Sequence, residues 1–202
     1  MSLLFKIRQY GFKNSIKRLC KKILAYCGLQ YESYFLMKNY LDKDTIGSQI
    51  SLLDFSTVKK LDYEDFLKGD QSIFTVSKLE RIKNRFQSEN HWAYGIVKDD
   101  KLIYSCWFKT EELEYPTLFN YKSKLTETEG LLFDAYCHPM HRGKGYHTTM
   151  NLYRLNKMIE QGLTTSVTFI NKDNTPSYRT QIHSGAVVEE TIIFLKLFSK
   201  SF

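Results

Sequence analysis

Apolar residues recur at helical spacing near the start of the chain. Between positions 12 and 27 the apolar positions are Phe12, Ile16, Leu19, Cys20, Ile23, Leu24 and Cys27. Residues three or four apart lie on one face of a helix, so this spacing predicts an amphipathic helix that ends before Gly28. The other faces carry five of the lysines and arginines of this segment, which makes the predicted helix basic.

The middle of the chain alternates between strand and helix patterns. The expected elements are, in order, a strand over residues 33–41, a strand over 48–55, helices over 56–69 and 77–87, and a β-hairpin over 91–108. Ser56 and Ser77 are the expected N-caps of the two helices. The hairpin is indicated by two aromatic and β-branched runs around the polar turn KDDK. Residues 109–129 show no clear period and are expected to form a loop.

The last third of the chain predicts strands and helices in strict alternation. The expected elements are strands over residues 130–139, 165–170 and 187–198, and helices over 146–162 and 175–185. Pro139 closes the first of these strands, and Pro176 fits the first turn of the second helix. Strands interleaved with helices in this way predict an α/β (α+β) fold, a mixed sheet with helices on its faces.

Basic charge is confined to the N-terminal segment. Residues 1–30 hold seven of the 29 lysines and arginines and no acid, so the other 172 residues carry 22 basic and 22 acidic side chains. A neutral main body argues against a nucleic-acid partner bound across the fold. The basic helix has two interpretations, which both stay open. It suits peripheral contact of residues 1–28 with an anionic membrane surface, and it equally suits packing on the body or on a partner chain.

The four cysteines form no CxxC pair and no disulfide framework, so they are expected to be reduced thiols in a cytoplasmic protein. No apolar run approaches the roughly 20 residues that a membrane-spanning helix needs. The chain is therefore expected to comprise a basic helical segment over residues 1–30 and one domain over residues 31–202.

The segment CHPMHRGKGYHTTM, residues 137–150, lies between a predicted strand and a predicted helix. The first N–H groups of a helix have no internal partner and attract an anion such as phosphate. Gly143 and Gly145 would let the backbone approach such a ligand closely, and Arg142 and Lys144 add positive charge. The histidines and Cys137 also raise the alternative of a metal site. No second cluster completes a four-ligand set, so no metal is expected.

The same segment resembles the acyl-coenzyme-A loop of the GNAT superfamily of N-acyltransferases, whose pattern is Arg/Gln-x-x-Gly-x-Gly/Ala. Arg142 and Gly145 match the first two fixed positions, and His147 stands where glycine or alanine is usual. A histidine there leaves less room beside the pyrophosphate. The resemblance implies a twisted sheet that is splayed between its fourth and fifth strands, with helices on both faces.

A second segment, NTPSYRTQIHSGA, resembles the Asn-x-x-Ser-x-Arg…Gly-Phe stretch of the same superfamily. The matching residues are Asn174, Ser177, Arg179 and Gly185, whereas Ala186 replaces the usual phenylalanine. The two resemblances together cover roughly residues 50–195. They imply that acetyl-CoA or another acyl-CoA is the donor. The residues expected to hold it are Ala135, Tyr136 and Cys137 by their main chain, Arg142, Gly143, Lys144, Gly145, Tyr146, His147 and Thr148 around the pyrophosphate, and Asn174 and Ser177 along the pantetheine arm.

The reaction that the resemblance implies is attack of an amine on a thioester, which requires a base because only a neutral amine attacks. Asp134 and His138 are the candidate bases; a strand carboxylate paired with a cation and an exposed strand-end histidine are the alternatives. Many relatives protonate the leaving thiolate with a tyrosine at the position that Gln181 fills here. Tyr178, one turn earlier, is therefore the candidate acid.

The acceptor is expected to be a small-molecule primary amine, such as an amino sugar or a lipid-linked glycan precursor. The aromatic residues that could line its site are Trp92, Trp107, Tyr115, Phe119 and Tyr121, although the strand residues Trp92 and Trp107 are better read as core. Two alternatives are acetylation of a protein N-terminus or lysine, and a non-catalytic module that binds a ligand or membrane. The oligomeric state is left open, a homodimer included.

Overall fold

The computed structural model describes residues 23–24, 28–115 and 121–197. The strands are β1 (Leu29–Tyr40), β2 (Lys59–Lys60), β3 (His91–Lys98), β4 (Lys101–Lys109), β5 (Glu112–Glu114), β6 (Lys122–Lys124), β7 (Glu129–Cys137), β8 (Thr165–Asn171) and β9 (Val187–Leu197). The helices are α3 (Lys43–Ile50), α4 (Tyr63–Leu67), α5 (Val76–Phe86), the short 3₁₀ helix η1 (Pro139–His141), α6 (Tyr146–Glu160) and α7 (Thr175–His183).

Seven of these strands form one mixed sheet in the order β2-β3-β4-β7-β8-β1-β9. Only β7 and β8 run parallel, and every other neighbouring pair is antiparallel. The predicted mixed sheet and the predicted hairpin, now β3 and β4, are confirmed. The expected loop over residues 109–129 is wrong in part, because β5 and β6 pair there as a separate two-stranded sheet.

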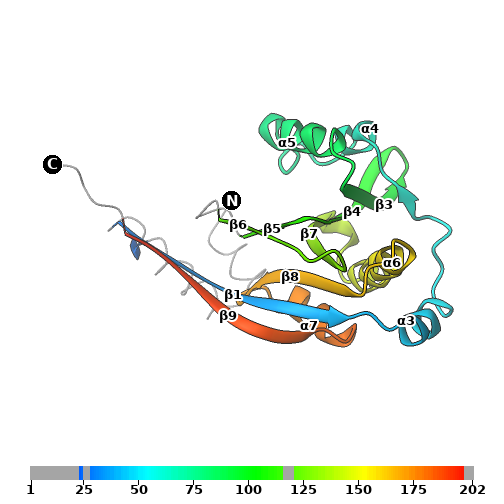
Figure 1. Ribbon diagram of the computed structural model, residues 1–202. Coiled ribbons are helices and arrows are strands. Elements are labelled where there is room, and N and C mark those ends of the chain that lie inside the picture. The colour runs from blue at the N-terminus through cyan, green and yellow to red at the C-terminus, as the bar shows by residue number, and fades with distance from the viewer. Residues whose placement is uncertain (1–22, 25–27, 116–120, 198–202) are drawn as a thin grey trace.

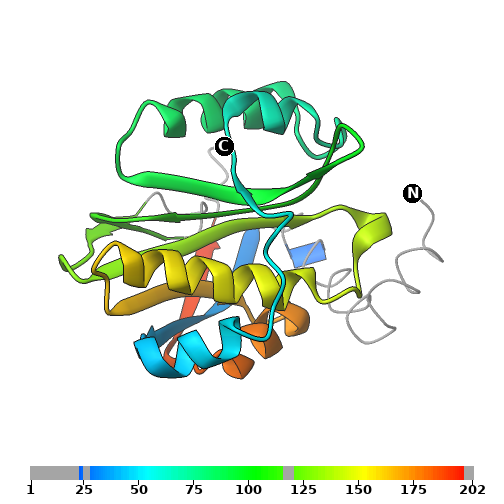
Figure 2. The ribbon, with the colours of Figure 1, turned by 90° about the vertical axis from the view of Figure 1, so that its right-hand side faces the viewer.

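Helices cover both faces of the sheet, as the two ribbon views show (Figures 1 and 2). On one face Met150, Leu155 and Met158 of α6 pack with Tyr104 and other residues of β4, and α3 joins this cluster. On the other face α4 and α5 pack against the opposite side of β3, β4 and β7. The small β5–β6 sheet covers the neighbouring part of that second face. Strands β7 and β8 therefore lie in the middle of the sheet, and a site between them would be bounded by both strands.

The strand expected over residues 48–55 is wrong. Helix α3 runs into the start of this region and ends at Ile50, and residues 51–55 form no strand. Asp42 caps this helix by accepting from the backbone N–H groups of Asp44 and Thr45, and Ile46 is buried against the core. The expected caps Ser56 and Ser77 are also wrong. Helix α4 begins later than expected and is capped by Asp62. Helix α5 begins earlier than expected and is capped by Thr75.

The predicted basic helix over positions 12–27 lies outside the described residues, apart from Ile23 and Leu24, which are helical. The membrane contact expected of residues 1–28 and the division at residue 30 therefore stay predictions. In the part of the chain that the structure describes, no helix is both long and apolar enough to cross a membrane.

Candidate active site between strands β7 and β8

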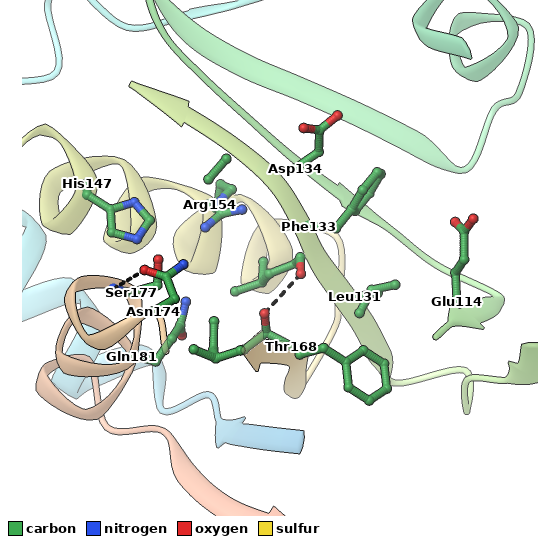
Figure 3. Close-up of a pocket in the computed structure, with 14 residues that line it drawn as sticks. Glu114, Leu131, Phe133, Asp134, His147, Arg154, Thr168, Asn174, Ser177 and Gln181 are labelled. Atoms are coloured by element: carbon green, nitrogen blue, oxygen red, sulfur yellow. Dashed lines mark hydrogen bonds between the residues drawn. The ribbon is translucent and has the colours of Figure 1, made fainter. Parts of the chain in front are cut away.

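Strands β7 and β8 stop pairing about halfway along β7. Their pairing runs from Glu129 opposite Thr165 to Leu132 opposite Thr168 and then stops. The Thr168 hydroxyl donates to the Leu132 carbonyl at 3.1 Å, at the point where the two strands begin to diverge (Figure 3). The splay expected between these strands is confirmed, and it leaves the inner edge of β7 without a strand partner beyond Leu132.

A β-bulge accompanies the splay. Ser105 of β4 lies opposite Tyr136 and Trp107 lies opposite Phe133, so one residue of β4 faces two residues of β7, Asp134 and Ala135. A bulge of this kind bends its strand and increases the local twist. Asp134 adopts a positive φ of 44°, in a region that aspartate tolerates better than most side chains. The bend directs β7 away from β8.

Asp134 is held in the bulge by two cations of α5. Its carboxylate oxygens lie 3.1 Å from Lys78 Nζ and 2.6 Å from Arg85 Nη1, and its side chain is 22% exposed. Burial alone would raise the pKa of Asp134, but the charges of Lys78 and Arg85 outweigh it and hold this pKa below its ordinary value. A carboxylate with both oxygens engaged is a weak base at neutral pH. The role of Asp134 as base stays a prediction that these ion pairs disfavour.

A cavity of about 290 Å³ opens in the gap between the two strands. Its lining includes Ala135 of β7 and the α7 residues Asn174 and Ser177, three of the residues expected to hold the donor (Figure 3). Helix α6 contributes His147 and Arg154, and α7 also contributes Gln181. Four of the predicted donor residues, Ala135, His147, Asn174 and Ser177, thus line one cavity, although they are up to 42 residues apart in the sequence. The other predicted donor residues, Tyr136, Cys137, Arg142, Gly143, Lys144, Gly145, Tyr146 and Thr148, are not part of its lining, and their role stays a prediction.

The glycine loop leads from the end of β7 into the start of α6. Gly145 is the N-cap of α6, with a φ of 79°, and no side chain caps the first N–H groups of this helix. Gly143 also has a positive φ, of 77°, and a Cβ added at either glycine would meet nothing within 4 Å. The loop is therefore open on its outer side. Arg142 is exposed, and its Nε donates to the Cys137 carbonyl at 3.3 Å.

His147 lies in the first turn of α6 and lines the cavity. Its Nδ1 lies 2.5 Å from the Tyr104 hydroxyl, and its Nε2 is buried with no partner among the described residues. Burial first, and then the charge of Arg154, lowers the pKa of His147 to about 4, so the ring is neutral at pH 7. The histidine that replaces glycine or alanine in the loop pattern is thus part of the cavity wall.

A buried polar network, which the sequence did not indicate, forms the floor of the cavity between α6 and α7. Asn151 Oδ1 accepts from Arg154 Nη2 and from Gln181 Nε2, both at 3.0 Å. Asn151 Nδ2 donates to Ser184 Oγ at 2.7 Å, and Arg154 Nη1 donates to the Trp107 carbonyl at 3.0 Å. Arg154 Nε and Gln181 Oε1 are buried and, in the described part of the chain, without a partner.

Solved structures share this architecture. A GNAT-family protein from Novosphingobium aromaticivorans is 10% identical over 85% of this chain and 69% of its own, with a TM-score of 0.56. The chain has the GNAT fold. The glucosamine N-acetyltransferase region of a fungal multi-domain β-N-acetylglucosaminidase gives a TM-score of 0.57 at 12% identity, over 90% of this chain and 23% of its own. An aminoglycoside N-acetyltransferase in complex with coenzyme A gives 0.52 at 12% identity, over 70% and 99%.

No protein-family model and no curated relative matches the sequence. At identities this low, similarity to solved structures establishes the fold alone. The activity of this GNAT-fold chain therefore has to be argued from its own site.

The two other catalytic candidates lie away from the cavity. His138 caps η1, where its Nδ1 accepts from the Met140 N–H at 3.3 Å. Tyr178 packs its ring 5.2 Å from that of Phe35, and neither residue lines the cavity. Their catalytic roles stay predictions without support from this geometry. Within the described residues, no group of three or more His, Cys, Asp or Glu side chains could hold a metal ion.

The ion pairs of Asp134 predict a specific loss of stability. Asp134→Asn keeps a side chain that tolerates the positive φ but removes the charge, and it should lower the free energy of unfolding at pH 7 by about 1 to 3 kcal/mol. Because the pKa of Asp134 is lowered in the folded state, its contribution is complete above about pH 4 and is lost as the pH falls through the lowered value. Urea unfolding at pH 7 and pH 3 should show the difference shrinking at the lower pH.

Asp100 offers a matched control. It too has a positive φ, of 54°, and an ion pair, 3.1 Å from Lys68, but its side chain is 84% exposed. Asp100→Asn should leave the unfolding midpoint unchanged, since exposed ion pairs contribute little. Equal effects of the two substitutions would contradict a special role for the bulge carboxylate.

Proposed function

We propose that this protein is an N-acyltransferase that transfers an acyl group, most simply acetyl, from acyl-CoA to a primary amine. One observation carries the proposal. The cavity in the gap between β7 and β8 is lined by His147 of the first turn of α6, and the N-terminus of this helix is uncapped and follows two glycines of positive φ. A ligand with a long polar arm and a pyrophosphate at its far end fits a gap and an anion site joined in this way.

The polar groups of the gap suit the pantetheine arm, which carries amide N–H and C=O groups. Beyond Leu132 the main chain of β7 no longer pairs with β8, so Ala135, Tyr136 and Cys137 can hydrogen-bond an added strand-like arm. Asn174 and Ser177 line the same gap from α7. Arg142 to Thr148 would hold the pyrophosphate through main-chain N–H groups and the charges of Arg142 and Lys144.

The chain's own residues would position the reactants and exclude water. The amine must lose a proton before or during its attack on the thioester carbonyl. His147, with a lowered pKa and one ring nitrogen already bonded to Tyr104, is poorly suited to take that proton. We therefore assign proton removal to water at the open side of the gap, and charge stabilisation to donors fixed around the carbonyl, such as a backbone N–H of β7.

An amino sugar is the proposed acceptor class. Phe169 lines the cavity, and Tyr115 packs 4.9 Å from Phe169 by ring centroids, which places aromatic faces beside the mouth of the gap. Aromatic faces suit the apolar faces of sugar rings. Glu114 also lines the cavity; one of its carboxylate oxygens pairs with Lys109 at 3.0 Å, and the other could accept a hydrogen bond from the acceptor's amine. The similarity to a glucosamine N-acetyltransferase region adds to this proposal, which a lipid-linked amino sugar would satisfy equally well.

The test is release of free thiol from acetyl-CoA in the presence of a panel of amines. Hexosamines and nucleotide-linked amino sugars should give acceptor-dependent release, and peptides with a free N-terminus or lysine should not. Thiol release with peptides but with no amino sugar would contradict the proposed acceptor class and indicate a protein substrate. Binding of coenzyme A without release for any amine would favour the non-catalytic alternative.

A substitution in the glycine loop predicts loss of donor binding. Gly145→Asn places a side chain that tolerates positive φ where the backbone would approach the pyrophosphate. The affinity for coenzyme A, measured by isothermal titration, should fall about tenfold or more, a loss of roughly 1.4 kcal/mol.

Gly162 provides the control, because it has nearly the same φ, 80°, and equally open surroundings just past the other end of α6. Gly162→Asn should bind coenzyme A like the wild type. Unchanged affinity in the Gly145 variant would mean that the pyrophosphate lies elsewhere.

A further inference from the structure

The polar network on the cavity floor has a fixed direction. Ser184 Oγ donates to the Thr180 carbonyl at 2.6 Å, so it must accept from the amide nitrogen of Asn151. The amide oxygen of Asn151 then accepts from both Arg154 and Gln181. Gln181 therefore donates its amide N–H to Asn151, and its Oε1 is left buried without a partner among the described residues. Arg154 Nε is likewise a buried N–H donor without a described partner, and both residues line the cavity.

Arg154 is a buried charge without a counter-ion in the described structure. The residue is 2% exposed, and its two hydrogen bonds go to neutral oxygens of Trp107 and Asn151. The two carboxylates that line the cavity are bound elsewhere, Asp134 by α5 and Glu114 by Lys109 at 3.0 Å. A buried guanidinium without an anion costs folding free energy, so its presence beside the cavity points to an anion that is bound during function.

The guanidinium lies at the inner end of the gap. Its Nη1 reaches the carbonyl of Trp107, whose strand partner is Phe133, the residue before the bulge. His147 is seven residues earlier on α6, about two helical turns nearer the glycine loop. If the pyrophosphate lies at the loop and the arm enters the gap, the end of the arm that reaches Arg154 is the end that carries the sulfur.

We propose that Arg154 stabilises the sulfur of coenzyme A as a thiolate when it leaves, in place of a residue that protonates it. This inference rests on the proposed function. In the step, the amine nitrogen bonds to the thioester carbonyl carbon, the carbon–sulfur bond breaks, and its electron pair stays on sulfur. The proton of the amine passes to water, and the thiolate pairs with the guanidinium.

Gln181 offers a polar group that suits the part of coenzyme A next to the sulfur. The amide N–H of coenzyme A nearest the sulfur is separated from it by two carbons, so an N–H donor and an anion lie close together in this ligand. Gln181 Oε1 and Arg154 Nε offer the matching acceptor and cation. The amide of Gln181 does not ionise near neutral pH, so Gln181 cannot act as the acid.

The proposal predicts how coenzyme A binding depends on pH. Other titratable groups also face this region, from β4, β5, β7 and α6: Tyr104, Cys106, Glu114, Asp134 and His147. Binding of coenzyme A therefore has to be compared with binding of desulfo-coenzyme A, which has the same phosphates and pantetheine arm but no sulfur. The ratio of the two affinities cancels the titration of protein groups and phosphates and reports the thiol alone.

For the wild type, the affinity ratio of coenzyme A to desulfo-coenzyme A should rise as the pH is raised from 6 to 9, approaching about tenfold for each unit by which binding lowers the pKa of the thiol. Arg154→Met should abolish the rise, and Arg154→Lys should retain part of it because the charge remains. Lys157→Gln, which removes a cation that pairs with Glu160 on the same helix, should behave like the wild type.

A ratio in the wild type that is flat or falls with pH would overturn the role of Arg154 while leaving the proposed function intact. Failure to bind either ligand would overturn the proposed function and this inference together. The wild-type comparison decides the question even if Arg154→Met does not fold, which thermal unfolding would show.

Discussion

The bulge at Asp134 is the constraint on which the site depends. β7 pairs with β4 on one side along most of its length, but it pairs with β8 on the other side over only four residues. The extra residue in the bulge turns the strand away from β8, and Lys78 and Arg85 hold the turned residue from the opposite face of the sheet. A backbone conformation that is unfavourable for most residues is thereby fixed by ion pairs with α5.

The two faces of the sheet carry different polar groups. On the α5 side, Asp134, Lys78 and Arg85 have a structural task, supported by the packing of Arg85 over the Trp107 ring at 5.2 Å. On the α6 and α7 side, the chain places polar groups where an ordinary core would be apolar. Asn151 and Arg154 are both buried on a helix whose neighbouring buried residues are Met150, Leu152 and Leu155. That polar floor costs stability in the free protein, and the proposed function accounts for its presence.

Much of the fold could be predicted from the sequence because its signals are local. The strand–glycine–helix segment from β7 to α6 and the Asn174–Gly185 segment of α7 each carry their own caps and turns, and both were predicted within a few residues. The helix over 43–50 was not, because a short apolar run is compatible with a strand or with the end of a helix. What decided it was the cap at Asp42, together with the burial of Ile46.

The site was harder to predict because its decisive contacts are long-range. Asp134 pairs with cations that are 49 and 56 residues away in the sequence, and no local sequence pattern predicts a bulge. Arg154 falls at a polar position of an amphipathic helix, where solvent exposure is the default expectation. Its hydrogen bond to the Trp107 carbonyl of β4 and the packing of α7 against α6 turn this position into part of the floor of a cavity.

A crystal structure of the complex with coenzyme A tests the central claim most directly, because it locates each part of the donor against the splayed strands. The account predicts the pantetheine arm between β7 and β8, the pyrophosphate at the main-chain N–H groups that begin α6, and the sulfur beside Arg154. Coenzyme A bound elsewhere, with the gap between β7 and β8 left to solvent, would contradict it.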